Sequence, residues 1–473
     1  MAAGKENGSA MQLSLEQIRY WMSAKFAAPV HGVAAEHASG YSIDSRTLQR
    51  GDLFFAVQGE RFDGHDFVEA ALQAGAVAAV VGSVQAARYT APAVRARLLL
   101  VDDPLSALQR LASSVRRHWG KRVIGITGSA GKTTTKEAIA QVLEGRFRVH
   151  KSHGNLNNHY GLPLQLLKLQ PEHEVAILEM GMSNAGEIAA LCHIAAPDWG
   201  VVTNVGNAHA QNFADGQAGI ARAKYELVAA LPRHGTAILN CDDPYVQQFG
   251  RDFDGTTIYF GTGACADPRA ESIVPMGAEG TRFMVRAGEQ RVEVLLRLLG
   301  EHNVRNALAG IAAGLASGVP LAECAAALQA LEPPDKRGQT IQIRGATILN
   351  DCYNSNPPAL QAMVDTLLTL PARRAIVVAG EMLELGPEGP HLHYLCGEYM
   401  GRRGVDIVLG ARGEAASIVK GASAAGAAAK FVDTPEEAGA WLRENLQPGD
   451  AVLLKASRGV RLERALEILR RAE

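Results

Sequence analysis

A glycine-rich run at residues 125–131 leads directly into Lys132 and Thr133, and this combination could hold the phosphates of a nucleotide. The apolar stretch 122–127 predicts a strand and the following residues predict a helix, so backbone N–H groups and a helix N-terminus would surround an anion. The ammonium of Lys132 could neutralise the outer phosphates, and the hydroxyl of Thr133 could bind Mg²⁺. Ile126 occupies the place of the first glycine in the standard Walker pattern, so the run departs from that pattern. These residues predict phosphate binding and specify no reaction.

Two more side chains of metal-binding type follow apolar runs that predict strands. Glu179 stands near the end of the run 175–180, and His209 comes shortly after another such run. Open parallel sheets gather their ligands at the carboxyl ends of the strands, so both side chains could hold Mg²⁺ beside the phosphate loop. Lys224 lies near the apolar stripe of a predicted helix at 219–231. There the residues alone favour a solvated lysine whose stem covers apolar surface.

The elements that must position these residues fall into three sections. Residues 11–118 contain short strands and glycine-punctuated turns, and they end in a helix that Asp103 is expected to cap. Residues 119–334 alternate apolar strands with helices, which predicts a mostly parallel sheet covered on both faces. After a proline-containing linker, residues 335–473 repeat the alternation as a second, smaller α/β sheet. Residues 1–10 are small and polar, and we expect a disordered lead-in there.

The composition is that of an ordinary globular protein, with 47% hydrophobic and 20% charged residues. A formal net charge of -2 argues against general binding to nucleic acids or to membrane surfaces. No apolar run approaches the roughly 18 residues that a membrane helix needs, and no signal peptide is visible, so we expect a cytoplasmic protein. The six cysteines are widely spaced, and we expect each to be a reduced, small, buried hydrophobic residue.

Taken together, the motifs resemble those of the Mur ligases over nearly the whole chain from Met11. The run TGSAGKTTTKE is similar to the short phosphate loop of that family, which explains the missing glycine at 126. The runs LEMGMSNAGEI, TNVGNAHAQNF, IARAKYEL and GEHNVRNALAG follow in the family's order, and the last section adds NDCYNSNP, VVAGEMLELG and LLKASRGVRLE. The opening run DSRTLQRGDLFFAVQGERFDGHDF resembles the family's UDP-binding domain.

The resemblance implies a three-domain α/β architecture. A small UDP-binding domain would span 11–118, a central ATP-binding domain with a mostly parallel sheet 119–334, and a Rossmann-like domain 335–473. It also implies an ATP-dependent amide ligase of peptidoglycan synthesis, with ATP and Mg²⁺ as cofactors. The run DCYNSNP and the Asn-rich loop SHGNLNNHYGLPLQLL resemble the members that join D-alanyl-D-alanine to UDP-N-acetylmuramoyl-tripeptide through an acyl phosphate. We expect a cytoplasmic monomer that binds neither nucleic acid nor membrane.

The resemblance assigns roles to individual residues as well. It implies catalytic roles for Lys132, His209, Lys224, Lys455 and Ser457. The expected ATP-binding residues are Thr127, Gly128, Ser129, Ala130, Gly131, Lys132, Thr133, Thr134, Asn303, Asn306, Arg337 and Asp351. The expected substrate-binding residues are Ser45, Arg46, Asn155, Asn157, Asn158, Asn354, Asn356 and Arg458. The expected Mg²⁺ ligands are Thr133, Glu179, His209 and Lys224, the last as a carbamate formed with CO₂. The linker at 333–338 is the expected hinge on which the third domain closes.

Two other functions stay open at this point. Another ligase of the family could add a single amino acid, although the Asp-Asn-Pro-Arg motif typical of the diaminopimelate-adding members does not occur in the sequence. A phosphate-loop nucleotide switch would belong to a different class. It would need the guanine-binding Asn-Lys-x-Asp signature, which the sequence lacks, and it would leave the third α/β section unexplained.

Overall fold

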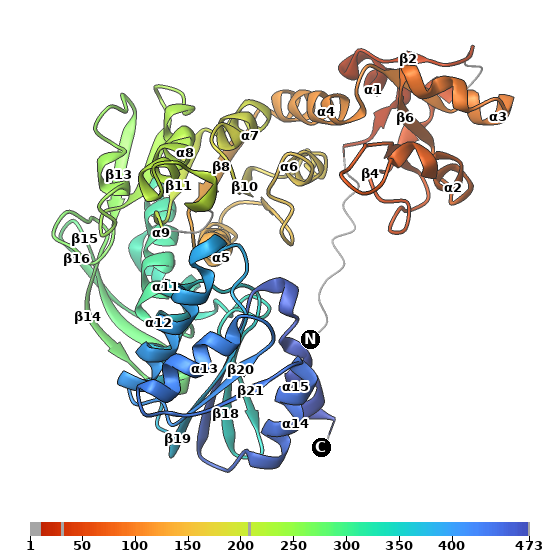
Figure 1. Ribbon diagram of the computed structural model, residues 1–473. Coiled ribbons are helices and arrows are strands. Elements are labelled where there is room, and N and C mark those ends of the chain that lie inside the picture. Colours follow the sequence, from red (N-terminus) through yellow and green to blue (C-terminus); the bar gives the residue numbers. More distant parts are fainter. Residues whose placement is uncertain (1–10, 30–32, 207–209, 472–473) are drawn as a thin grey trace.

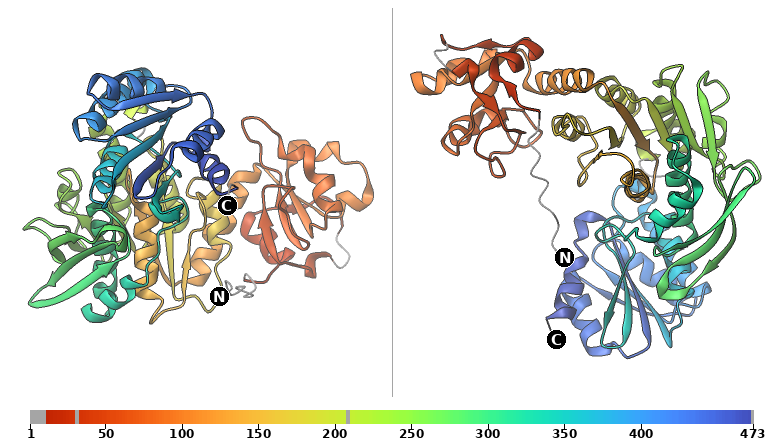
Figure 2. Two further views of the ribbon diagram at one scale, coloured as in Figure 1. Left: turned by 90° about the horizontal axis from the view of Figure 1, so that it is seen from below. Right: turned by 180° about the vertical axis from the view of Figure 1, so that it is seen from behind.

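The chain forms three lobes that follow the order of the sequence, as Figure 1 shows for the computed structural model. The structure describes residues 11–29, 33–206 and 210–471, so the lead-in predicted at 1–10 lies outside the described residues. The second and third lobes lie side by side in every view. The first lobe stands apart from the third in Figure 1 and in the right-hand view of Figure 2, and helix α4 (Pro104–Trp119) joins it to the second.

The first lobe is built on a five-stranded sheet of order β2-β7-β6-β5-β4, in which β2 is antiparallel and the other four strands are parallel. These strands are β2 (Lys25–Phe26), β4 (Gly40–Ser42), β5 (Asp52–Phe55), β6 (Ala78–Gly82) and β7 (Leu98–Val101). The lobe also contains α1 (Leu15–Met22), α2 (Val68–Gln73), α3 (Pro92–Arg95) and the pair β1 (Leu13–Ser14) and β3 (His37–Ala38). Helix α4 begins as predicted, because the Asp103 carboxylate accepts a hydrogen bond from the Ser106 N–H at 2.8 Å.

The second lobe has a six-stranded, fully parallel sheet of order β13-β12-β11-β8-β10-β9. Its strands are β8 (Arg122–Thr127), β9 (Val149–Lys151), β10 (Val175–Glu179), β11 (Trp199–Val202), β12 (Thr236–Asn240) and β13 (Thr256–Phe260). Its helices are α5 (Lys132–Leu143), α6 (Gly161–Leu166), α7 (Glu187–Ala195), α8 (Gln217–Ala229), α9 (Glu301–Ala316) and α10 (Leu321–Gln329). The apolar residues of α5, from Ala138 to Leu143, are buried and pack the helix against the sheet and α9, which holds the phosphate loop in place.

A three-stranded antiparallel sheet extends the second lobe, and the sequence analysis did not predict it. Its strands are β14 (Arg269–Pro275), β15 (Thr281–Ala287) and β16 (Gln290–Leu296), paired in the order β14-β15-β16. Phe283 and Val285 are buried on β15, as are Val294 and Leu296 on β16. This alternation of inward and outward side chains is the period of an antiparallel strand. The prediction of strand–helix alternation throughout 119–334 is therefore wrong for this segment.

The third lobe is the second α/β sheet that the sequence predicts. Its strand order is β17-β18-β22-β19-β20-β21, with β17 antiparallel to β18 and the other strands parallel. The strands are β17 (Gln339–Ile343), β18 (Ala346–Asp351), β19 (Arg374–Gly380), β20 (Ile407–Ala411), β21 (Ala428–Val432) and β22 (Asp450–Lys455). The helices are α11 (Pro357–Leu368), α12 (Gly389–Arg402), α13 (Ala415–Ala424), α14 (Pro435–Asn445) and α15 (Glu463–Arg470). The predicted α/β fold class is confirmed.

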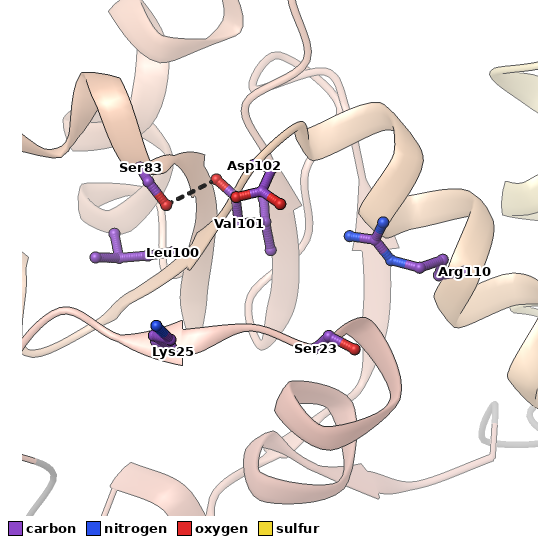
Figure 3. A pocket seen from close by; sticks show the side chains of 7 residues that line it. All are labelled: Ser23, Lys25, Ser83, Leu100, Val101, Asp102 and Arg110. Carbon is purple, nitrogen blue, oxygen red and sulfur yellow. Dashed lines mark hydrogen bonds between the residues drawn. The ribbon is translucent and has the colours of Figure 1, made fainter.

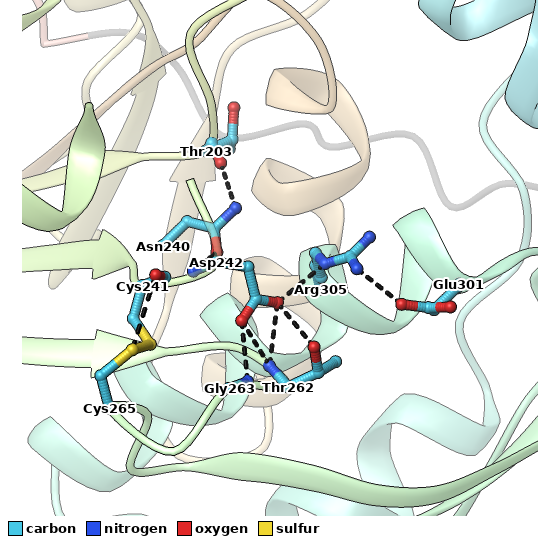
Figure 4. Close-up of polar contacts among 9 residues, drawn as sticks. All are labelled: Thr203, Asn240, Cys241, Asp242, Thr262, Gly263, Cys265, Glu301 and Arg305. Atoms are coloured by element: carbon cyan, nitrogen blue, oxygen red, sulfur yellow. Dashed lines mark hydrogen bonds and ion pairs between the residues drawn. A yellow bond between two sulfur atoms is a disulfide. The ribbon is translucent and has the colours of Figure 1, made fainter. Parts of the chain in front are cut away.

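Cysteine usage differs from the prediction. Cys241 and Cys265 form a disulfide just beyond the ends of β12 and β13 (Figure 4), so the expectation of six reduced cysteines is wrong for this pair. The two residues are 24 positions apart in the sequence, and only the parallel pairing of β12 with β13 brings them together. Cys192, Cys324, Cys352 and Cys396 are free and buried, as expected. Within the described part of the chain, no helix has the length and apolar character to cross a membrane.

Candidate active site

The phosphate loop connects the end of β8 to the start of α5. Gly128 and Gly131 adopt φ values of 152° and 83°, which side chains other than glycine rarely tolerate. A Cβ atom on Gly128 would lie 1.8 Å from the Thr203 hydroxyl oxygen, so this position also lacks space for any side chain. The Lys132 ammonium donates a hydrogen bond to the Gly128 carbonyl oxygen at 2.6 Å. The loop and its lysine therefore have the compact geometry that the sequence predicts for phosphate binding.

The segment after β11 clamps the phosphate loop from the neighbouring strand. The Asn204 side chain accepts a hydrogen bond from the Ala130 N–H at 2.9 Å and donates one to the Ala130 carbonyl oxygen at 3.0 Å. The Thr203 hydroxyl donates to the same carbonyl at 2.6 Å, and the Gly206 N–H donates to the Ser129 hydroxyl oxygen at 2.8 Å. Four hydrogen bonds thus set the conformation of Ser129 and Ala130, and the sequence analysis assigned no role to Asn204.

Two lysines, Lys132 and Lys224, lie close enough at this loop for their charges to interact. Burial lowers the pKa of Lys132, with the charge of Glu179 acting against that shift and the charge of Arg337 adding to it. Burial also lowers the pKa of Lys224 well below its usual value, and the nearby charge of Lys132 contributes. Lys224 is only 3% exposed, so the interpretation as a solvated surface lysine is wrong. Among the described residues, Lys224 has no acidic partner within ion-pair distance.

Lys136 is a residue of this site that the sequence analysis missed. The residue is 2% exposed, and its ammonium lies 3.3 Å from Glu179 Oε1 and 3.1 Å from Glu137 Oε1. It also donates a hydrogen bond to the Ser152 carbonyl oxygen at 2.6 Å. The available signal was its spacing, because Lys136 follows Lys132 by four positions and therefore shares its side of α5.

Glu179 has the chemistry of a Mg²⁺ ligand. Its side chain is 4% exposed at the end of β10, and its Oε1 atom receives no hydrogen bond from the described residues. A buried carboxylate oxygen that, within the described part of the chain, accepts no hydrogen bond and has only the Lys136 ammonium at 3.3 Å fits a small cation that prefers oxygen ligands. His209 lies outside the described residues, and no three His, Cys, Asp or Glu side chains of the described chain converge as a metal-binding group.

Asn303 and Asn306 lie beneath the phosphate loop on α9. The Asn306 side-chain oxygen accepts a hydrogen bond from the Thr135 hydroxyl at 3.2 Å, and a Cβ atom on Gly131 would lie 2.5 Å from it. The Asn306 amide donates to the Asn303 side-chain oxygen at 3.0 Å, and the Asn303 amide donates to a backbone carbonyl at 2.8 Å. Both side chains are buried and support the loop from below. Their expected contact with adenine stays a prediction.

Two neighbouring strand ends of the third lobe contribute a buried ion pair. Asp351 and Lys455 are register partners on β18 and β22, and their side chains form a short ion pair. The Lys455 ammonium also donates to the Asn354 carbonyl oxygen at 2.9 Å. The Ser457 hydroxyl oxygen accepts a hydrogen bond from the Leu383 N–H at 2.9 Å, and the Asn356 side chain caps α11. The predicted residues of this lobe therefore lie together, with several of their polar groups holding loops in place.

The third lobe faces the phosphate loop. His302 on α9 is half-buried, and the charges of Asp351 and Lys455 act on it across the boundary between the second and third lobes. Burial lowers the pKa of His302 to about 4, with the Asp351 charge opposing that shift. The charge of Arg337 in the linker also helps to lower the pKa of Lys132. The linker therefore approaches the nucleotide side of the second lobe, as do the ends of β18 and β22. The structure thus brings the predicted residues of these two lobes into one region.

The predicted substrate residues of the first and second lobes occupy loops. Ser45 and Arg46 follow β4, and the exposed Arg46 guanidinium pairs with the Asp44 carboxylate at 2.7 Å, which lowers the pKa of Asp44. The Asn158 side-chain oxygen accepts a hydrogen bond from the N–H of Gly161, the first residue of α6, at 2.9 Å. Asn157 lies against Gly181, whose Cβ position is 2.8 Å from the Asn157 side-chain oxygen. Asn155 is exposed in the same loop.

A separate pocket of about 180 Å³ opens in the first lobe (Figure 3). It is lined by Ser23, Lys25, Ser83, Leu100, Val101, Asp102 and Arg110. Ser83 and Asp102 follow the parallel strands β6 and β7, so the pocket shares the carboxyl edge of the sheet with Ser45 and Arg46. None of the lining residues was among the predicted substrate contacts, and the pocket lies toward the opposite side of the sheet from β4.

Comparison with protein families gives three matches in chain order. The model of the Mur ligase family catalytic domain matches residues 37–116, that of the Mur ligase middle domain matches 126–314, and that of the Mur ligase glutamate ligase domain matches 336–458. Among curated relatives, the UDP-N-acetylmuramoyl-tripeptide–D-alanyl-D-alanine ligase of Bacillus subtilis is 38% identical and the alignment covers 93% of each chain. The protein of the same name from Synechocystis is 36% identical, covering 95% of this chain and 96% of the relative.

Solved structures are similar over the same extent. A crystal structure of MurF from Acinetobacter baumannii superposes with a TM-score of 0.87 at 29% identity, covering 98% of this chain and 99% of the other. The MurF ligase from Thermotoga maritima in complex with ADP has a TM-score of 0.80 at 31% identity, covering 91% of this chain and 97% of the other. The likeness extends through all three lobes.

Proposed function

Because this chain belongs to the Mur ligase family, we propose that it is an ATP-dependent ligase that joins D-alanyl-D-alanine to UDP-N-acetylmuramoyl-tripeptide. The product is the pentapeptide precursor of peptidoglycan. The observation that carries this proposal is the extent of the likeness, since the Bacillus subtilis ligase with this activity in its name aligns over 93% of both chains. The Thermotoga maritima relative solved with ADP supports a nucleotide at the phosphate loop.

The proposed reaction activates a carboxylate that is otherwise a poor acyl donor. The terminal carboxylate oxygen of the tripeptide attacks the γ-phosphorus of ATP, and the bond from that phosphorus to the β,γ-bridging oxygen breaks to release ADP. The amine of D-alanyl-D-alanine then attacks the acyl phosphate, inorganic phosphate leaves, and the amine nitrogen loses a proton. The first step brings two anions together, so fixed positive charge near the phosphates is the main requirement. Lys132, at the start of α5, has its ammonium hydrogen-bonded to the loop carbonyl of Gly128 and would supply it.

The need for positive charge near the phosphates also calls for a metal ion. Thr133 and Glu179 would hold Mg²⁺ at the phosphate loop, and His209 and Lys224 complete the proposed ligand set. When bound, Mg²⁺ would neutralise charge on the phosphate oxygens. The protein's own contribution is the position of Glu179, which Lys136 keeps close to the loop as a buried carboxylate.

Carbamylation of Lys224 remains a proposal that its environment supports. The group is buried beside Lys132, and burial lowers its pKa. The neutral amine is the form that reacts with CO₂, and the product is an anion that compensates the neighbouring ammonium. We expect Lys224→Ala to lose activity and to regain part of it when short carboxylic acids are added. Full activity of the variant, or no rescue, would remove carbamylation from the mechanism.

The third lobe would bring in the dipeptide. Arg337 and Asp351 are proposed to reach the nucleotide, while Lys455, Ser457 and Arg458 would face the acyl phosphate or the dipeptide carboxylate. The linker at 333–338 would serve as the hinge, and closure would exclude water that hydrolyses the acyl phosphate. In the first lobe, Ser45 and Arg46 are proposed to contact the UDP group. We further propose that the enzyme is monomeric and works in the cytoplasm, where ATP is available.

Two alternatives are less favoured. The diaminopimelate-adding ligase of the same family has a TM-score of 0.53 and 18% identity, which supports a shared fold alone. A nucleotide switch would not explain relatives of one enzymatic name that align through all three lobes. ADP release separates the alternatives, because the proposed ligase releases ADP rapidly only with both UDP-tripeptide and D-alanyl-D-alanine present, whereas a switch would hydrolyse ATP slowly without either.

Isotope labelling tests the acyl phosphate directly. With oxygen-18 in the terminal carboxylate of the tripeptide, one labelled oxygen should appear in the released inorganic phosphate. If the label stays entirely in the peptide product, the proposed chemistry is wrong. A panel of tripeptides with diaminopimelate or lysine at the third residue would identify the accepted substrate from the rate of ADP formation.

A further inference from the structure

The aromatic ring of Tyr353 meets two arginines in the third lobe. The guanidinium carbon of Arg337 lies 3.8 Å from the ring centroid, and that of Arg458 lies 5.7 Å from it. Both distances fall within the range of about 6 Å over which a cation is attracted to the face of an aromatic ring. The two arginines come from different segments, the linker before β17 and the loop after β22. A single side chain therefore contacts both.

The backbone around Tyr353 is tied to the same two segments. The Tyr353 N–H donates a hydrogen bond to the Lys336 carbonyl oxygen at 3.1 Å, next to Arg337 in the linker. The Lys336 ammonium pairs with Glu463 at 2.9 Å, and the Arg458 guanidinium lies 3.6 Å from the same carboxylate. The ring is thus held at a fixed place between the linker and the loop after β22.

Arg337 differs from Arg458 in its other contacts. Arg458 has Glu463 as an acidic neighbour, whereas within the described part of the chain Arg337 has no acidic partner at ion-pair distance. The charge of Arg337 reaches the phosphate loop, where it helps to lower the pKa of Lys132. A guanidinium that stacks on a ring and lacks a carboxylate keeps its donors available for an anion. The phosphates of a nucleotide would be such an anion.

We propose that Tyr353 is a positioning residue that presents the Arg337 guanidinium to the nucleotide phosphates and sets Arg458 beside it. This inference rests on the proposed ligase function. Because the ring contacts an arginine expected on the nucleotide side and one expected on the dipeptide side, its loss should weaken both interactions, with the larger effect at Arg337, whose contact is closer. The tyrosine hydroxyl has no part in this role.

The test compares Tyr353→Phe, which keeps the ring, with Tyr353→Leu and Tyr353→Met, which remove it. A cation–π contact is worth about 0.5–2 kcal/mol, which corresponds to about 2- to 30-fold in binding. We expect both ring-free variants to raise the KM for ATP by about 5- to 20-fold and the KM for D-alanyl-D-alanine by a smaller factor. Tyr353→Phe should stay within about 2-fold of the wild type. The KM for UDP-tripeptide and the melting temperature should change little.

Tyr399→Leu is the matched control, because Tyr399 is a half-buried tyrosine of the same lobe whose hydroxyl bonds Asp365. It should leave every KM unchanged. Arg337→Ala should raise the KM for ATP, and adding Tyr353→Leu to it should cause little further change, since the ring acts through that arginine. The proposal is overturned if ring-free variants keep the wild-type KM for ATP, if Tyr353→Phe is as damaged as Tyr353→Leu, or if the two effects simply add. Absence of ADP formation by the wild type with all three substrates would instead refute the proposed function.

Discussion

Removing the Asn204 side chain tests whether the phosphate loop depends on the clamp from β11. Asn204→Ala deletes the hydrogen bonds to the N–H and to the carbonyl of Ala130, at 2.9 and 3.0 Å. The Thr203 hydroxyl still bonds the same carbonyl at 2.6 Å, so the loop should loosen without unfolding. The variant should therefore affect the nucleotide more than the fold.

The magnitude follows from the two lost bonds. A neutral hydrogen bond contributes about 0.5–1.5 kcal/mol net, so two contribute about 2 kcal/mol. Ala130 is exposed, so water can replace part of this hydrogen-bond free energy in the free enzyme. We expect a net cost of about 1–2 kcal/mol when the loop is ordered around the phosphates, or about 5- to 30-fold in nucleotide affinity.

Isothermal titration with ADP and the KM for ATP measure this effect, and thermal unfolding reports the fold. Asn445→Ala is the control, because its amide donates a single hydrogen bond to Trp441 on α14, in the third lobe and away from the loop. A nucleotide affinity of Asn204→Ala within 2-fold of the wild type would refute the clamp. If the variant loses as much free energy of unfolding as it loses in binding free energy, Asn204 supports the lobe as a whole.

Three further predictions concern the second lobe. Burial holds the pKa of His150 at about 3, so the unfolded chain takes up a proton below about pH 6.5 and the folded chain does not. Stability is therefore lost as the pH falls, by about 2 kcal/mol between pH 7 and pH 5, and urea titrations should show a smaller loss for His150→Phe. Reduction of the disulfide, or Cys241→Ser, should destabilise the lobe by about 3 kcal/mol because the two cysteines lie 24 positions apart and close a loop of that length. Thiol titration of the unfolded, unreduced protein should count four thiols, and a count of six would contradict the disulfide. Lys136→Met should cost about 3–5 kcal/mol in denaturant unfolding because it leaves Glu179 as an unpaired buried charge, and a loss under 1 kcal/mol would contradict that role.

Local signals in the sequence located the phosphate loop. The strand at 122–127 and the helix start at Lys132 were predictable because glycines, apolar runs and a helix N-terminus occur within a few residues of one another. The same holds for α4, whose cap depends on Asp103 and Pro104 alone. Each of these features is decided by neighbours along the chain, so a single sequence is sufficient to predict it.

Features that depend on distant partners were missed. In the sequence, Lys136 resembles an ordinary helix lysine because its partner Glu179 is 43 positions away, at the end of β10. The disulfide between Cys241 and Cys265 required the pairing of β12 with β13. The burial of Lys224 was likewise invisible, since a lysine near an apolar stripe is compatible with a solvated end. Only the packed structure decides such cases.

The relation between the second and third lobes has a physical basis that neither lobe contains alone. Leu299, just before α9, is 5% exposed and packs in the apolar core that includes Leu360 and Val364 of α11. This contact anchors the third lobe next to the helix that carries Asn303 and Asn306, while the linker at 333–338 leaves Arg337 facing Lys132. We propose that this apolar contact keeps the two lobes together when the linker bends, while the Arg337 guanidinium gains an anionic partner only when a nucleotide enters. Nucleotide binding should therefore favour the closed arrangement through Arg337, and Arg337→Ala should weaken closure without separating the lobes.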